Sequence, residues 1–266
     1  MRLRQPALTA MLAIGIAACS APTATPLSHA DLTIYGAASL NGVLARVKTA
    51  YEAAVPGTTL TIATDSSATL ETQIEQGAPA DVFLSADTTN PQKLVDGGFA
   101  AGAPVPFAGN RLVVVVPVDN PAGIRTPADL ARAGVKVIGA GDDVPITAYA
   151  NQLVANLAQE AGYPSGFAAA YAANVVSKED NARAVIAKLE LGEGDAGIVY
   201  ATDAAASDKV ATIGVPDTAN VQATYEGTVV NGSRNPVAAA AFLDWLAGAD
   251  GQAILGGFGF LPAARP

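Results

Sequence analysis

Short β-rich runs alternate with longer stretches of helical periodicity from Asp31 onward, and this alternation limits the possible folds more than any other feature. Residues 32–35 and 60–63 predict strands, and residues 40–54 between them predict a helix with one apolar face. Residues 111–116 form a continuous apolar run that predicts a strand buried on both faces. Strands that alternate with helices are typical of an α/β architecture with largely parallel sheets.

The remaining elements continue this pattern to the end of the chain. Further strands are predicted at 82–85, 135–139, 175–176, 198–200, 211–214 and 225–230, and further helices at 68–76, 91–96, 147–161, 167–172, 181–191 and 236–246. About a dozen strands would be unusual in one open sheet, so two α/β domains with a cleft between them are expected. We expect Trp245 and Phe258 to pack in the core, as single aromatic residues usually do.

The composition excludes several classes of function. The chain has 24 acidic and 15 basic residues, for a net charge of −9, and the basic residues are scattered rather than clustered. No surface is therefore expected to bind nucleic acid. One cysteine and one histidine are too few for metal sites built on thiolate and imidazole, or for Cys-His chemistry within a cleft. We expect no cofactor and no direct metal ligands, and we expect His29 to be without a functional role.

The N-terminus predicts export. Residues 1–18 carry two arginines and then an apolar run of about a dozen residues, shorter than the ~20 that span a bilayer, which is typical of a secretory signal peptide. The run ends in Ile16-Ala17-Ala18-Cys19, which resembles the bacterial lipobox. Cleavage before Cys19 and acylation would anchor the protein to the membrane, with residues 19–30 as a tether. The alternative is an ordinary signal peptide with an incidental cysteine.

One glycine pattern matches a nucleotide-binding motif only in its letters. Residues 192–197 satisfy G-x-G-x-x-G, but they follow a predicted helix and precede a predicted strand. A dinucleotide fold requires the reverse order, strand then loop then helix. We interpret the segment as the end of a helix and a tight turn.

Small polar residues stand where predicted helices begin after predicted strands. Ser39, the pair Ser66-Ser67, Val144–Thr147 and Asn181–Ala182 occupy four such places. The N-terminus of a helix offers unpaired N–H donors and about half a positive charge. Several N-termini in one cleft would bind an anion without lysine or arginine. The alternative is that these residues only cap their helices.

These positions belong to motifs that resemble one known family. The motifs are Ala37-Ala38-Ser39-Leu40, the segment 66–87, residues 110–116, Val144-Pro145, Asn181-Ala182-Arg183, the segment 192–204 and Gly257-Phe258. In content and order they resemble the substrate-binding protein of molybdate ABC transporters, the ModA family. The resemblance covers residues 31–260.

The resemblance implies a type II periplasmic-binding-protein fold with two lobes, each a mixed, mostly parallel sheet flanked by helices. Lobe 1 would comprise residues 31–109 and 224–266, and lobe 2 residues 110–223. The chain would cross between the lobes near Asn110 and near residues 221–224. The ligand would bind in the cleft between the lobes.

The resemblance also implies the residues that bind the ligand. Ser39 and Ser67 would bind a tetrahedral oxyanion through hydroxyl and backbone N–H groups, with Ser66 as an alternative to Ser67. Tyr200 would contribute its phenol, and Ile146 and Ala182 their backbone N–H groups. We expect the carboxylate of Asp65, beside the second serine pair, to point away from the site.

This set of donors predicts the class of ligand. A fully deprotonated oxyanion such as molybdate or tungstate presents only acceptors, whereas phosphate keeps a proton near neutral pH and requires an acceptor in the site. Together with the lipobox-like N-terminus, the resemblance implies a monomeric, extracytoplasmic lipoprotein that captures molybdate or tungstate and delivers it to an ABC transporter permease. A receptor for sulfate or another oxyanion is the first alternative. An exported serine hydrolase using Ser39 or Ser67 is the second, although His29 lies in the predicted tether and no lysine lies near either serine in sequence.

Overall fold

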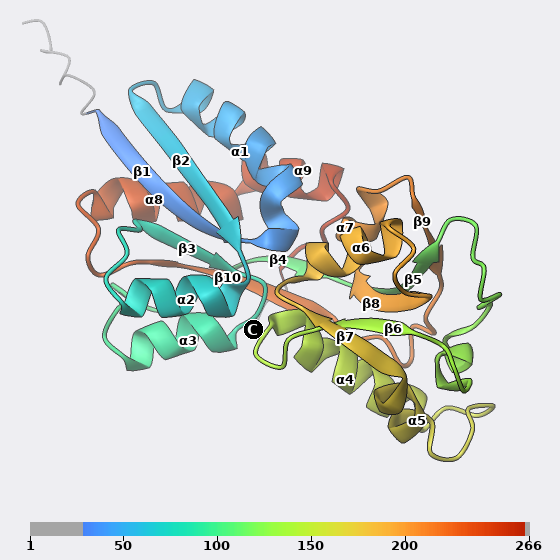
Figure 1. Cartoon of the computed structure of the whole chain (residues 1–266). Coiled ribbons are helices and arrows are strands. Elements are labelled where there is room, and N and C mark those ends of the chain that lie inside the picture. Colours follow the sequence, from blue (N-terminus) through green and yellow to red (C-terminus); the bar gives the residue numbers. More distant parts are fainter. Residues whose placement is uncertain (1–28, 264–266) are drawn as a thin grey trace, which may run out of the picture.

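The structure is a computed structural model that describes residues 29–263. It contains two five-stranded sheets, each flanked by helices, and Figure 1 shows them as two lobes side by side. We call the part built on the sheet β2-β1-β3-β10-β4 lobe 1 and the part built on the sheet β7-β6-β8-β5-β9 lobe 2. This is the predicted two-lobed α/β fold. The predicted signal peptide and Cys19 lie outside the described residues.

The elements follow one another in an order that alternates strands and helices through most of the chain. Their bounds in lobe 1 are β1 Ala30–Ala37, a 3-10 turn η1 Ala38–Leu40, α1 Asn41–Ala54, β2 Thr58–Asp65, α2 Ser67–Glu75, β3 Val82–Ser85, α3 Thr89–Asp96, β4 Val105–Asn110, β10 Ala223–Val229, α8 Pro236–Ala247 and α9 Ala249–Gly257. Those in lobe 2 are β5 Leu112–Pro117, a 3-10 turn η2 Pro127–Ala131, β6 Val137–Ala140, α4 Pro145–Leu157, α5 Phe167–Asn174, β7 Val175–Glu179, α6 Ala182–Glu190, β8 Ala196–Tyr200, α7 Ala201–Ala205 and β9 Val210–Ile213.

Four of the five strands in each sheet run in one direction. In lobe 1, β1 is parallel to β2 and β3, and only β10 is reversed, because it pairs antiparallel with β3 and β4. In lobe 2, β6 is parallel to β7 and β8, and only β5 is reversed. The sheets are therefore mixed and mostly parallel. Each reversed strand is the one by which the chain enters that lobe from the other.

The two segments that pass between the lobes lie against each other. The first is the step at Arg111, between β4 and β5, and the second runs from the end of β9 at Ile213 to the start of β10 at Ala223. The Asn220 side chain joins them, since its oxygen accepts from the Leu112 N–H at 3.1 Å and its nitrogen donates to the Leu112 carbonyl at 2.9 Å. The link between the lobes is thus a pair of hydrogen-bonded segments.

One core expectation is confirmed in part and one is wrong. Trp245 packs edge-on against Tyr51, with ring centroids 5.1 Å apart, and lies at the border of the core. Phe258 is 43% exposed. It follows the last residue of α9, and the chain instead buries Leu255 within that helix and Phe260 after it.

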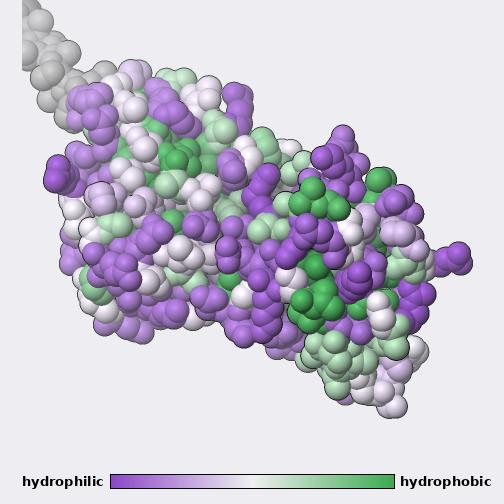
Figure 2. All heavy atoms as spheres, in the orientation of Figure 1, coloured by the Kyte–Doolittle hydropathy of each residue, from purple (hydrophilic) through white to green (hydrophobic). Residues whose placement is uncertain are grey.

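The surface is mostly hydrophilic on the face shown in Figure 2, and the larger hydrophobic areas of that face lie on lobe 2. Val176 on the edge strand β7 and Leu191 after α6 are among the exposed hydrophobic residues of that lobe. Among residues 29–263, no helix combines the length and the apolar character needed to cross a membrane.

Candidate functional site

A small pocket lies where the two lobes face each other, and all five residues predicted to bind the oxyanion line it. Ser39 and Ser67 come from lobe 1, and Ile146, Ala182 and Tyr200 come from lobe 2. The other lining residues are Ala37, Ala38, Ser66, Ala86, Val144, Pro145 and Asn181. Residues that are far apart in the sequence therefore meet in one place.

The topology explains why helix N-termini meet there. The turn η1 follows β1 directly, α2 begins two residues after β2, and α4 and α6 begin shortly after β6 and β7. Carboxyl ends of parallel strands lie at the same edge of a sheet, so the helices that follow them begin at that edge. The first N–H groups of each helix have no carbonyl one turn earlier to bind. The Ile146 and Ala182 N–H groups are of this kind.

The serine side chains at these helix starts do not cap their helices. Ser39 lies in η1, and its hydroxyl is 2.9 Å from the Tyr225 hydroxyl. Ser67 accepts a hydrogen bond from the Ala86 N–H at 3.1 Å, and the Ser66 hydroxyl is buried with no partner among the described residues. In contrast, the Asn181 side chain caps α6 by accepting from the Ala184 N–H at 3.0 Å. Helix capping therefore accounts for Asn181 but not for the serines.

Tyr200 is the buried aromatic residue of the pocket. It is the last residue of β8 and only 1% exposed, and its hydroxyl has no hydrogen-bond partner within residues 29–263. Burial raises the pKa of this phenol well above its ordinary value, and the neighbouring Tyr225, Tyr149 and acidic groups raise it further. The hydroxyl stays protonated at neutral pH. A buried donor without a partner is costly, so it marks a position where a ligand acceptor would be favourable.

The pocket contains no lysine or arginine among its lining residues, as expected for a site built on helix N-termini. Asp65 is not among the lining residues either, and its carboxylate accepts from the Ser66 N–H at 2.7 Å. The groups in the lining that could attract an anion are therefore backbone N–H groups at helix starts and hydroxyl donors. Within the described part of the chain, no group of three or more His, Cys, Asp or Glu residues could hold a metal ion.

Ala86 is the lining residue that the sequence analysis missed. It follows β3, the third parallel strand of lobe 1, and its N–H points to the Ser67 hydroxyl. An alanine carries no polar side chain, so only its place after a predicted strand could have indicated it. Ser66 and Ser67 both line the pocket, and both hydroxyls can donate to a ligand.

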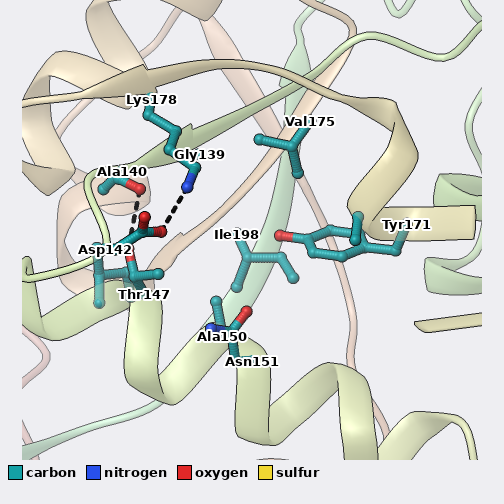
Figure 3. Close-up of a pocket in the computed structure, with 12 residues that line it drawn as sticks. Gly139, Ala140, Asp142, Thr147, Ala150, Asn151, Tyr171, Val175, Lys178 and Ile198 are labelled. Carbon is teal, nitrogen blue, oxygen red and sulfur yellow. Dashed lines mark hydrogen bonds and ion pairs between the residues drawn. The ribbon is translucent and has the colours of Figure 1, made fainter. Parts of the chain in front are cut away.

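A second cavity, of about 180 Å³, lies within lobe 2 and shares Ile146 with the pocket between the lobes. Figure 3 shows the Tyr171 hydroxyl pointing into it and the ion pair between Lys178 and Asp142, which are 2.5 Å apart, at its edge. The Thr147 hydroxyl nearby already donates to the Ala140 carbonyl at 3.1 Å. The ion pair and the Thr147 hydroxyl at its edge are thus bonded within the protein, whereas the Ser66 and Tyr200 hydroxyls of the pocket between the lobes have no partner among the described residues.

Comparisons with known proteins agree with this fold. The family model of bacterial extracellular solute-binding proteins matches residues 32–261. The molybdate-binding protein ModA of Mycobacterium tuberculosis is 32% identical over 260 residues, which cover 95% of each chain. The substrate-binding domain of a putative molybdenum ABC transporter from Clostridium difficile is 27% identical with a TM-score of 0.66, over 88% of this chain and 100% of that one.

The fold extends to binding proteins for other oxyanions. The sulfate-binding protein SubI of M. tuberculosis superposes with a TM-score of 0.76 at 23% identity, over 88% of this chain and 87% of that one. The matched family and these relatives are binding proteins rather than enzymes, so the serine hydrolase interpretation is wrong. This chain, with the same fold and a cleft built from helix N-termini, belongs to the bacterial extracellular solute-binding proteins and is of the ModA type.

Proposed function

We propose that this protein captures molybdate or tungstate outside the cytoplasm and delivers it to the permease of an ABC transporter. The observation that carries the proposal is the pair of buried hydroxyls, on Ser66 and Tyr200, that face the pocket without a partner among the described residues. They stand beside the first-turn N–H groups of Ile146 and Ala182, so the pocket offers donors from both lobes. No cofactor has a role in this proposal.

The ligand class follows from the side chains that line the pocket, which include hydroxyls able to donate but no carboxylate that could only accept. Molybdate and tungstate are fully deprotonated at neutral pH and present four acceptor oxygens. Each hydrogen bond to a charged group contributes about 1.5–3 kcal/mol. Several such bonds, reduced by the cost of closing the lobes, are consistent with a dissociation constant of roughly nanomolar to micromolar.

Thermal unfolding of protein freed of bound anions tests the proposal. A ligand at 100 times its Kd adds about 2.7 kcal/mol to the stability, which raises the Tm by about 5–10 °C. We expect this rise with molybdate and tungstate, and none with phosphate. A rise in Tm with sulfate alone would instead indicate a receptor for sulfate, the first alternative. No rise with any of the four anions would overturn oxyanion binding altogether.

The proposal includes a lipid anchor on Cys19 and a monomeric state. The signal-like residues 1–18 and the lipobox-like sequence before Cys19 support the anchor, and membership of an extracellular family supports the location outside the cytoplasm. Expression in a bacterial host should place the parent protein in the membrane fraction and the variant Cys19→Ala outside it. Equal partition of both proteins would overturn the anchor without affecting the proposed ligand.

A further inference from the structure

A line of buried polar side chains runs from the pocket to the segment that crosses between the lobes. The Ser39 hydroxyl contacts the Tyr225 hydroxyl at 2.9 Å, and the Asn110 side-chain nitrogen donates to the same Tyr225 oxygen at 3.4 Å. The second N–H of that nitrogen donates to the Thr202 hydroxyl at 2.8 Å. All four residues are buried, so water does not compete for these bonds.

The orientation of the Asn110 amide is determined by its neighbour. Its oxygen accepts from the Arg111 backbone N–H at 2.9 Å, and a backbone N–H can only donate. The nitrogen of the amide must therefore face Tyr225 and Thr202. An amide nitrogen donates and does not accept, so the Tyr225 oxygen is the acceptor in this bond.

The direction of the remaining bonds follows from this one. The Tyr225 hydroxyl has two recorded partners among the described residues, and since the Asn110 nitrogen can only donate, the Tyr225 hydrogen finds an acceptor only at the Ser39 oxygen. Burial keeps the phenol protonated, since it raises the pKa of Tyr225 well above the ordinary value, with a further rise from Asp203. Ser39 then accepts from Tyr225, and its hydroxyl hydrogen is available for the pocket.

We propose that Asn110 and Tyr225 are positioning residues that orient Ser39 as a hydrogen-bond donor toward the bound oxyanion, and so favour fully deprotonated oxyanions over those that carry a proton. This inference rests on the proposed function. It assigns a specificity role to two residues that do not line the pocket. Hydrogen bonds that run in one sense along a chain strengthen one another in a medium of low dielectric constant.

The decisive variant is Asn110→Asp, which keeps the shape of the side chain and the acceptor for the Arg111 N–H. A carboxylate only accepts, so Tyr225 would donate to it, and Ser39 would donate to Tyr225 and turn its lone pairs to the ligand. We expect the Kd for molybdate, measured by calorimetry, to rise about 10- to 100-fold, the equivalent of one hydrogen bond to a charged ligand. We also expect the preference for molybdate over hydrogen phosphate to fall at least tenfold, because an acceptor would now meet the phosphate hydroxyl.

The negative charge that Asn110→Asp introduces would itself weaken anion binding. Making the same substitution in a Tyr225→Phe protein separates this effect of charge from the effect on the orientation of Ser39. If Asn110 acts through Tyr225, the loss caused by Asn110→Asp is several times smaller in this background. Tyr51→Phe removes a hydroxyl from another buried tyrosine of lobe 1 and should leave affinity and preference unchanged. The Tm of each protein without ligand shows whether it is folded.

The outcomes are distinguishable. Equal losses from Asn110→Asp with and without the Tyr225→Phe substitution, or an unchanged preference between molybdate and hydrogen phosphate, would overturn this inference and leave the proposed function intact. If the unsubstituted protein binds no oxyanion, the proposed function itself is overturned, and this inference with it. A loss that depends on the Tyr225 hydroxyl, together with the shift in preference, would establish the orienting role.

Discussion

The Tyr200 hydroxyl is buried and has no hydrogen-bond partner among the described residues. Its removal can therefore test ligand binding without a loss of folding stability. Removing it with Tyr200→Phe takes away a donor to the ligand but no hydrogen bond recorded within the folded chain. We expect the Kd for molybdate to rise about 10- to 100-fold. The Tm without ligand should stay the same or increase, because an unsatisfied polar group is removed. An unchanged Kd in calorimetry would contradict the role of this hydroxyl.

Asp203 predicts how stability depends on pH. Burial raises the pKa of this carboxyl to about 7, although the Arg183 guanidinium lowers it. The unfolded chain has an ordinary aspartate pKa of about 3.9, so the folded state binds more protons between about pH 4 and pH 7. Stability from this group is therefore present at low pH and is lost as the pH rises through this window.

The variant Asp203→Asn should remove that dependence, because an amide does not ionise. Above pH 7 we expect it to be more stable than the parent by about 1–3 kcal/mol, the usual cost of a buried unsatisfied group. Below pH 4 the difference should be small. Urea unfolding without ligand at pH 4 and pH 8 measures the free energy of unfolding of both proteins. A difference between parent and variant that is the same at both pH values would contradict the prediction.

At the scale of elements, the close packing of β8 on α6 holds two parts of the pocket together. Tyr200 ends β8 and Ala182 begins α6, and Gly197 is the residue of β8 that packs closely against Val185 of α6. A Cβ added at Gly197 would lie 2.9 Å from Val185 Cγ1 and 3.0 Å from the Ile138 carbonyl oxygen. Gly197→Ala should lower the stability by about 1–3 kcal/mol and also weaken molybdate binding.

The matched control is Gly214→Ala, directly after β9, where an added Cβ meets no atom within 4 Å. It should leave both the Tm and the Kd near those of the parent. If Gly197→Ala also left them unchanged, the backbone would be adjusting without cost, and the packing argument would fail.

The elements that sequence periodicity predicted are those with a clear apolar face. Strand β3 has the predicted bounds, and α1 differs from its prediction by one residue at its start. Strand β4 was not predicted because a proline and a glycine break its pattern, and α9 was not predicted because that helix contains several glycines. Both depend on tertiary partners, since β4 pairs with β10 and α9 packs on α8.

The residues that line the pocket could be predicted more completely than these elements. Helices that follow parallel strands begin at the same edge of the sheet, and the family motifs indicate which residues stand at those helix starts. The hydrogen bonds that link Ser39, Tyr225 and Asn110 could not be predicted from the sequence. Ser39 and Tyr225 are 186 residues apart in sequence, and their contact depends on the return of the chain to lobe 1 through β10. A tyrosine in a predicted strand is ordinarily a core residue, and only the hydrogen bonds around it reveal another role.

At the scale of the whole molecule, one hydrogen-bonded contact joins the helix that begins at the pocket to the strand that carries the chain back to lobe 1. The Tyr149 hydroxyl, on α4, accepts from the Thr224 N–H at 3.2 Å and lies 3.5 Å from the Thr224 carbonyl. Thr224 is in β10, directly after the second crossing. This contact stabilises the arrangement in which residues of both lobes line one pocket.

Tyr149→Phe should therefore shift the protein toward an open arrangement without removing any group that lines the pocket. A hydrogen bond between neutral groups contributes about 0.5–1.5 kcal/mol, so we expect the Kd for molybdate to rise about 2- to 13-fold. Small-angle scattering without ligand should give a larger radius of gyration than the parent, and saturating molybdate should abolish the difference, since a ligand that binds the closed form shifts the equilibrium toward it. Tyr171→Phe, on α5 beside the second cavity, is the matched control and should change neither quantity. A weaker Kd with an unchanged radius would mean that Tyr149 acts on the shape of the pocket and not on closure.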